Sequence, residues 1–310
     1  SAQVPCSLTS TGKVYVDRAT TGSDTEPVGL DELAVKVPVY NARIAQATLD
    51  DNGFQLVKHR WDHVDYYDEE QLLQTYYPEV CALIKRVTGA KKVLAFDHNI
   101  RTSAVASWMN KSAEGPVPKQ IKKGNAVQSP ATVVHNDYTM TSAPLRLQLL
   151  SQPPKANDTL AKVLGQTPLI APEESSELMK GRWAMVNLWR NISEHPVQDM
   201  PLAMCDSSTI SNDDLITFEV RYTDRTGENY FAKHSDAHRW NYFPQATRDE
   251  AILLKVWDSH GAAFSGQTAD PSPAHAVPAT FSLHSAFVDP TAAADCPKRE
   301  SIEVRTVVFY

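Results

Sequence analysis

The second half of the chain is a succession of short apolar or alternating segments, and this pattern restricts the fold more than any other feature. After Pro130 these segments are separated by turns rich in Asp, Asn, Gly and Pro. Such a series is typical of antiparallel sandwiches and barrels. The segments are ATVVH (131–135), RWAMVNLWR (182–190), PLAMCD (201–206), LITFEVRYT (215–223), ENYFAKH (228–234), AILLKVWDS (251–259), TFSLHSAF (280–287) and SIEVRTVVFY (301–310). We therefore expect residues 131–310 to form a jelly-roll core.

The first 130 residues have a mixed α/β character. Strand patterns occur at GKVYV (12–16), GFQLVKH (53–59) and KKVLAFDHNIR (91–101). From Asp68 to Val87 apolar residues recur three and four positions apart, acidic residues fill the first turn, and Gly89 follows, so we predict a long helix. A helical segment is also expected around 159–180. The polar stretch 103–130 is predicted to be a long loop and is a candidate lid.

We expect a single domain of residues 1–310, in which the mixed α/β part (1–130) packs on the core (131–310). The fold class predicted is mainly β with helices.

Composition and charge exclude several classes of protein. The net charge is −7, and the basic run KQIKKG (119–124) is short, which disfavours non-specific binding of nucleic acid. The sequence contains no apolar stretch of about 18 residues, as a membrane span requires. It also lacks the glycine-rich phosphate-binding turns of Rossmann and P-loop proteins. The four cysteines form no C-x-x-C pair, so we expect neither a zinc knuckle nor a disulfide framework, and a cytoplasmic location.

A His-x-Asp pattern supplies two of the three ligands of a mononuclear non-haem iron site. The pattern occurs at His63–Asp65, His135–Asp137 and His234–Asp236. The first pair lies just before the predicted helix, where solvated polar residues and a helix cap explain it. The third pair lies in a turn between strands. His135 alone directly follows an apolar strand segment, so we predict that His135 and Asp137 bind the metal.

The third ligand must come from the strand-rich half. The candidates are His195, His234, His238, His260, His275 and His284. His284 ends a strand segment, and Arg299 opens the final strand, an arrangement that can place both side chains in one barrel mouth. The two-pronged guanidinium of arginine suits a carboxylate such as the distal one of 2-oxoglutarate. The rival pair is His238 with Arg248, but Arg248 lies in a predicted turn and is expected to be solvated. We favour His284.

An ordered set of segments gives this chain a family resemblance. VHNDYT, NLWRNI, PVQDMPLAMCD, HRWNYFP, DEAILLKVWDS, HSAF and RESIEVR resemble, in that order, the hydroxylase/desaturase family of iron(II)/2-oxoglutarate enzymes of secondary metabolism, which has fungal members. The resemblance covers roughly Gly53 to Phe309. One departure is Asn191, where the family pattern leads us to expect proline.

The resemblance implies a double-stranded β-helix of the cupin type in one catalytic domain, with Fe(II) and 2-oxoglutarate as cofactors. It implies that Fe(II) is bound by His135, Asp137 and His284, and that Arg299 anchors 2-oxoglutarate. The implied partners are O2 and a small-molecule substrate, an apolar, polycyclic natural-product intermediate. The implied reaction is C–H abstraction that leads to hydroxylation, desaturation or endoperoxide formation.

Further residues are weaker candidates. For the cosubstrate these are Thr139 and Arg305, although Thr139 is equally suited to orienting Asp137 and Arg305 to a structural salt bridge. For the substrate pocket they are Tyr138, Asn187, Trp189 and Arg190. Asn187, Trp189 and Arg190 also fit alternating inward and outward positions of a strand.

Two other functions use the same core. A cupin-type lyase or isomerase would employ the three ligands as a Lewis-acid site without 2-oxoglutarate, and would not need Arg299. A non-catalytic jelly-roll binding module would use the histidines only for packing.

Overall fold

The computed structural model describes residues 2–8, 14–21, 27–61, 64–104, 127–156, 158–223, 225–262 and 276–310. Its strands are β1 (Ala2–Leu8), β2 (Val14–Asp17), β3 (Asp31–Val37), β4 (Val39–Asn41), β5 (Phe54–Lys58), β6 (Lys92–Thr102), β7 (His135–Asn136), β8 (Trp183–Asn191), β9 (Leu202–Cys205), β10 (Leu215–Arg221), β11 (Thr226–Ala232), β12 (Trp240–Tyr242), β13 (Glu250–Asp258), β14 (His284–Ala286) and β15 (Glu300–Phe309). Its α-helices are α1 (Arg18–Thr21), α2 (Glu69–Gln71), α3 (Tyr77–Thr88), α5 (Ser142–Leu150), α6 (Ala161–Leu164) and α7 (Pro172–Leu178).

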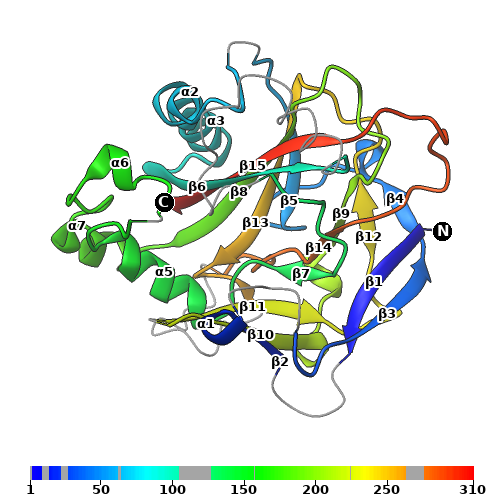
Figure 1. The fold of residues 1–310 in the computed structure, drawn as a ribbon, viewed down its shortest axis with the longest axis horizontal. Helices are drawn as coiled ribbons and strands as arrows, with labels where there is room; N and C mark the ends of the chain where they lie inside the picture. The colour runs from blue at the N-terminus through cyan, green and yellow to red at the C-terminus, as the bar shows by residue number, and fades with distance from the viewer. Residues whose placement is uncertain are drawn as a thin grey trace.

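Two sheets form the body of the protein (Figure 1). The larger has the strand order β2-β10-β11-β7-β14-β9-β12-β4, and the smaller has the order β5-β13-β8-β15-β6. Strands β8, β13 and β15 of the smaller sheet are almost wholly buried, and their apolar side chains belong to one continuous core. Helix α3 packs against β6 and β15, and β1 pairs with β3 as a separate ribbon. The prediction of a mainly β protein with helices is confirmed.

The long helix predicted from Asp68 to Val87 exists, with one irregularity. Asp68 caps it by accepting hydrogen bonds from the backbone N–H groups of Glu70 and Gln71, and Gly89 ends it in the left-handed conformation. Between α2 and α3, residues 72–76 form a π-helical turn. This turn directly precedes Pro78, whose missing backbone N–H cannot continue the regular hydrogen-bond ladder.

The strand predicted at residues 131–135 is shorter than expected, because ordered pairing begins only at His135. Before that point the chain crosses from one sheet to the other. Gln128 exchanges backbone hydrogen bonds with Ile100 and Thr102 of β6, and the carbonyl of Ala131 accepts one from Ala286 of β14. No element was predicted at residues 142–150, which form helix α5.

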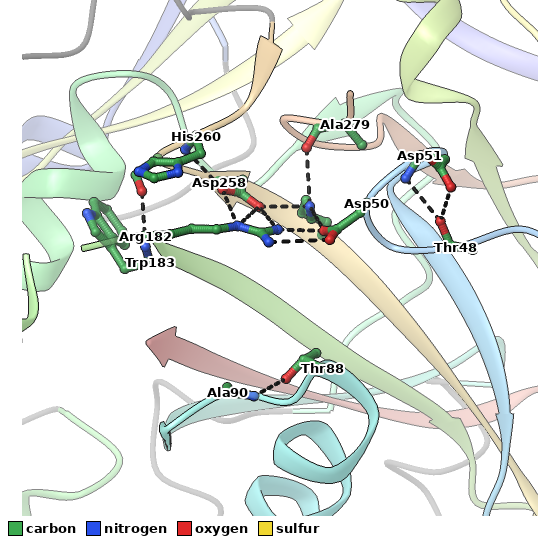
Figure 2. A network of polar contacts seen from close by, with 12 residues as sticks. Thr48, Asp50, Asp51, Thr88, Ala90, Arg182, Trp183, Asp258, His260 and Ala279 are labelled. Atoms are coloured by element: carbon green, nitrogen blue, oxygen red, sulfur yellow. Dashed lines mark hydrogen bonds and ion pairs between the residues drawn. The ribbon is translucent and has the colours of Figure 1, made fainter. Parts of the chain in front are cut away.

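An ionic network built around the buried pair Lys255–Asp258 lies at one end of the smaller sheet (Figure 2). The Lys255 ammonium is fully buried and donates to Asp50 (2.8 Å), to Asp258 (2.8 Å) and to the carbonyl of Ala279 (3.2 Å). Arg182 bridges the same two carboxylates. All three ammonium donors are therefore used, and the network joins β8 and β13 to the loops at Asp50 and Ala279.

Within the described ranges no helix combines the length and the apolar character that crossing a membrane requires. The predicted lid, residues 103–130, falls largely outside the described residues, because positions 105–126 are not among them.

Candidate metal centre and its pockets

Three strands of the smaller sheet present polar side chains on one face, because successive side chains of a strand alternate between faces. On β15 these are Ser301, Glu303 and Arg305, and Arg299 immediately precedes the strand. Their register neighbours are Arg101, Asn99 and Asp97 on β6, and Trp189 and Asn187 on β8, opposite Glu303 and Arg305 respectively. Together these side chains form a polar surface on one face of the smaller sheet, within an otherwise apolar core.

The two predicted histidine ligands lie side by side on adjacent strands of the larger sheet. His135 on β7 is directly paired with His284 on β14, and their ring centroids are 4.4 Å apart. Asp137 is the residue directly after β7. One ligand atom from each of His135, Asp137 and His284 lies within 4.8 Å of the other two. The structure thus brings together the three residues that the sequence singled out.

Both imidazoles are oriented by the backbone. Nδ1 of His135 lies 2.8 Å from the carbonyl oxygen of Val133, and Nδ1 of His284 lies 3.1 Å from that of Ser282. A carbonyl can only accept, so each Nδ1 carries the proton and each Nε2 keeps its lone pair. This is the tautomer that a metal ligand bound through Nε2 requires.

The two oxygens of the Asp137 carboxylate have different surroundings. Its Oδ2 accepts hydrogen bonds from Asn187 Nδ2 (2.8 Å) and Arg305 Nε (3.2 Å). Its Oδ1 lies 4.0 Å from Nε2 of His135 and has no hydrogen bond within the described part of the chain. Oδ1 is therefore the oxygen available to a cation, and the donor set fits a divalent metal with two open imidazole nitrogens and one carboxylate.

The electrostatic environment favours the protonation states that metal binding needs. Burial and the neighbouring His284 lower the pKa of His135 to about 4, and burial also lowers the pKa of His284. Burial opposes the ionisation of Asp137, but Arg305 and the two histidines outweigh it and hold its pKa well below the usual range. Burial and the nearby Asp137 raise the pKa of Glu303. At neutral pH the site thus has neutral imidazoles beside an ionised Asp137.

Arg299 is the most unusual charge of the site. It is 3% exposed, and no carboxylate pairs with it within the described residues. Its Nε donates to Ser301 Oγ (3.1 Å), its Nη1 donates to the carbonyl of Met200, and its guanidinium carbon lies 5.4 Å from the ring centre of Trp189. Burial and the neighbouring Arg101 lower its pKa to about 9. A buried cation without a counter-ion is a ready partner for an anionic ligand.

Arg299 and the three candidate metal ligands line one pocket, which encloses about 420 Å³ including its open mouth. The remaining polar lining residues are Asn99, Arg101, Ser285, Ser301, Glu303 and Arg305. The sequence did not single out Asn99, Arg101, Ser285, Ser301 or Glu303. The period-two alternation from Arg299 to Arg305 was a signal for Ser301 and Glu303, whereas the β6 residues required knowledge of strand order.

Arg305 connects the metal centre to a second cavity. It donates through Nη1 to Asp97 Oδ2 (2.9 Å) as well as through Nε to Asp137, and the Asn99 amide oxygen, oriented toward it, accepts from Nη2 at 2.8 Å. Asn99, Asp137 and Arg305 line both pockets. The second cavity encloses about 1460 Å³ including its mouth.

The weaker candidates divide into two groups. Trp189 lines the first pocket, Tyr138 lines the second, and Asn187 holds Asp137. Arg190 and Thr139 do not line these pockets. Arg190 points to the opposite face of β8, where it donates to the Tyr76 hydroxyl and to the carbonyls of His59 and Arg248. This corrects its assignment to the substrate pocket, because strand alternation separates it from Trp189.

Thr139 has a local structural role instead of a cosubstrate contact. Its hydroxyl donates to Glu228 (2.8 Å) and accepts from the backbone N–H of Ser142, at the start of α5. The rival third ligand, His238, is buried and hydrogen-bonded to Asp214 (3.1 Å). His234 and Asp236 pair with each other in a turn. His63 and His275 lie outside the described residues.

Comparisons with known proteins point to the same class of enzyme as the candidate metal centre does. The family profile described as "Oxidoreductase/YMDC permease-like domain" matches residues 8–167 and 161–309. The alpha-ketoglutarate-dependent dioxygenase phiK of a fungal species is 30% identical over 91% of this chain and 85% of its own length. The hydroxylase/desaturase efuI of Hormonema carpetanum is 28% identical over 93% of this chain and 84% of its own length.

Among solved structures, the fold is similar to that of the iron and alpha-ketoglutarate-dependent endoperoxidase NvfI. The TM-score is 0.69 at 24% identity, with 99% of this chain and 97% of that chain covered. The match to phiK shows that this chain belongs to the iron(II)/2-oxoglutarate-dependent dioxygenases, and the likeness to NvfI shows a shared fold.

Proposed function

We propose that this protein is an Fe(II)/2-oxoglutarate-dependent oxygenase in which His135, Asp137 and His284 hold the iron and Arg299 anchors 2-oxoglutarate. Fe(II) and 2-oxoglutarate are the cofactors of the family, and a small molecule and O2 are its substrates. The observation that carries the proposal is the cluster of three ligand atoms in the same pocket as a buried arginine to which no carboxylate of the described residues is paired.

We further propose that the two sheets form a double-stranded β-helix and that residues 1–310 act as one catalytic domain. The placement of the candidate site supports this. The candidate ligands come from short strands of the larger sheet, and the candidate anchor comes from the smaller sheet, so the site needs both layers.

The cytoplasm is the proposed location, since the reduced cysteines Cys81, Cys205 and Cys296 fit a reducing compartment.

The protein's own groups have defined tasks in this reaction. The carbonyls of Val133 and Ser282 fix the two imidazoles, while Asn187 and Arg305 hold one oxygen of Asp137 and leave the other for the metal. Bound iron with 2-oxoglutarate supplies the oxidising power to break an unactivated C–H bond. The residues that line the pockets would position the substrate carbon near the metal.

Arg299 and Ser301 are suited to the distal carboxylate of 2-oxoglutarate. The Nη2 group of Arg299 has no hydrogen-bond partner in the described ranges, and Ser301 Oγ lies beside Nε. Arg101, lining the same pocket, adds positive charge. Charge-assisted pairing to a desolvated carboxylate would also relieve the cost of burying Arg299.

The substrate is proposed to be a natural-product intermediate, and its oxidation to end in hydroxylation, desaturation or endoperoxide formation. The names of the relatives, which include hydroxylase/desaturase and endoperoxidase, support this range of outcomes. The second cavity, which shares Asp137 with the metal centre, is the proposed substrate site.

An anaerobic titration tests the proposal. Fe(II) and 2-oxoglutarate added together to the protein should produce a weak visible charge-transfer band, and admission of O2 should yield succinate. A cupin-type lyase would turn over without 2-oxoglutarate and give neither signal, and a binding module would give no band. Either of those results would overturn the proposed function.

A further inference from the structure

The second cavity has a polar, arginine-rich lining that an apolar substrate does not require. Its charged residues are Arg18, Asp97, Asp137, Arg146, Asp158, Arg225 and Arg305. Asp97 and Asp137 are both paired with Arg305, and Asp97 also accepts from the Thr159 hydroxyl at 2.6 Å. Among the lining residues, Asp158 is therefore the carboxylate that remains to face the other three arginines.

Arg146 is the lining arginine with donors to offer. It lies on α5, its guanidinium carbon is 4.9 Å from the ring centre of Phe96, and its ion pair with Asp158 is long, at 3.9 Å. It makes no hydrogen bond within the described part of the chain. A guanidinium carries five N–H donors in a rigid fork, a geometry that matches a carboxylate or a phosphate.

Two further arginines line the same cavity. Arg18 on α1 and Arg225, before β11, lie against the Tyr222 ring, with guanidinium carbons 5.2 Å and 4.4 Å from its centre. Arg18 also donates to the Tyr222 hydroxyl at 3.2 Å. The Tyr222 ring and the Arg146 guanidinium, in a cavity that reaches Asp137, suit a substrate with an apolar body and a negative substituent.

We propose that the substrate carries an anionic group, a carboxylate or a phosphate, and that Arg146 binds this group while the apolar body reaches toward the metal centre. This inference rests on the proposed function, since it assigns the second cavity to the substrate. It refines the expectation of an apolar natural product: the skeleton is apolar, and a charged substituent orients it.

A fluorescent probe series tests the inference without knowledge of the substrate. The probes are 1-pyrenebutyrate, its methyl ester, and a pyrenylalkyl phosphate of the same chain length. Binding is followed by fluorescence anisotropy to the protein loaded with Mn(II) and saturating 2-oxoglutarate, which occupies the first pocket. At least one anionic probe should bind about tenfold or more tightly than the ester, and the stronger anion identifies the class of substituent.

Three variants sharpen the result. Arg146→Gln should remove the preference for the anion and leave ester binding near its original value. Asp158→Asn should strengthen anion binding, because it removes the carboxylate that competes for Arg146. Arg86→Gln, at an exposed position of α3, is the matched control and should change nothing.

Equal affinity for anions and ester, absence of anion binding, or an anion preference that survives Arg146→Gln would each overturn the inference. The 2-oxoglutarate charge-transfer band is recorded on the same samples with Fe(II). A normal charge-transfer band without a preference for the anionic probes would contradict this inference alone. Absence of the band would contradict the proposed function itself.

Discussion

Asp137 uses its two carboxylate oxygens differently, and this division explains why one of three His-x-Asp patterns is set apart. Oδ2 is held by Asn187 and Arg305, which leaves Oδ1 beside His135. Asp236 only pairs with His234 on the surface, and Asp65 accepts from the backbone of Tyr67. The neighbours that make a metal ligand come from distant strands, so the pattern alone does not reveal them.

Asp137→Ala should abolish Mn(II) binding, measured by isothermal titration calorimetry, because the site loses its only anionic ligand. Asp236→Ala and Asp65→Ala should leave the affinity unchanged within about twofold, since neither carboxylate approaches the two imidazoles. Comparable loss of metal in either control would show that the wrong pair had been chosen.

The metal affinity should depend little on pH between 8 and about 5.5. The depressed pKa of His135, about 4, and the lowered pKa of His284 mean that protons compete for these ligands only in more acidic solution. The same shifts affect stability. In the unfolded chain histidine takes up a proton near pH 6.5, so the apo protein should lose stability as the pH falls from about 6.5 toward 4.

Mn(II) affinity measured across this pH range checks the prediction. A decline of tenfold or more between pH 7.5 and 6 would indicate histidines with ordinary pKa values and would contradict the account.

Arg299→Ala should raise the 2-oxoglutarate concentration needed for half-saturation by on the order of a hundredfold, because a charge-assisted bidentate pair is lost. Metal binding should persist. Arg299→Lys should recover part of the loss, since an ammonium cannot form both parallel hydrogen bonds. Arg305→Ala should do the reverse, weakening the metal more than 2-oxoglutarate, because Arg305 contacts Asp137. Unchanged 2-oxoglutarate affinity in Arg299→Ala would remove it as the anchor.

At the scale of elements, most strands of both sheets were predictable, whereas the bounds of the shortest strands of the larger sheet were not. The segments around β8, β13 and β15 have long apolar runs, and each was expected near its observed bounds. Strands β7 and β14 span only His135–Asn136 and His284–Ala286, and their pairing with each other depends on contacts distant in sequence. Local pattern therefore located the candidate ligands but not the short pairing between them.

Arg190 was assigned to the wrong face of its strand because burial hides the alternation of the side chains. The segment RWAMVNLWR is buried on both faces, so period-two alternation is hidden by continuous apolar character. Asn187 and Trp189 face the metal centre, and Arg190 faces Tyr76 of the π-helical turn and the backbone of His59 and Arg248. The sequence alone offered both assignments.

The ionic network of Figure 2 gives an element-scale prediction. Asp258→Ala should lower the free energy of unfolding by about 3–5 kcal/mol, because it leaves the fully buried Lys255 ammonium with one carboxylate fewer. Removing the exposed pair Lys180–Glu177 by Lys180→Ala should cost no more than about 0.5 kcal/mol. Urea denaturation measures both. Equal small effects would mean that the network does not stabilise the junction of β8 and β13.

At the scale of the whole molecule, the candidate site depends on the two sheets facing each other. His135 and His284 belong to the larger sheet, while Arg299, Arg305 and Asn187 belong to the smaller sheet or its margin. The sequence indicated a β-rich fold and the family resemblance gave its class. Strand order and register, which bring Asn99 and Arg101 of β6 beside β15, arise from packing of the complete chain.

The central claim is that His135, Asp137 and His284 form the metal site, and an anomalous diffraction experiment on anaerobic crystals soaked with Mn(II) and 2-oxoglutarate tests it most directly. The account predicts one strong anomalous peak within roughly 2.0–2.3 Å of Nε2 of both histidines and Oδ1 of Asp137, with 2-oxoglutarate reaching from the metal to Arg299. A peak coordinated by His238 or His234, or no peak near β7 and β14, would contradict it.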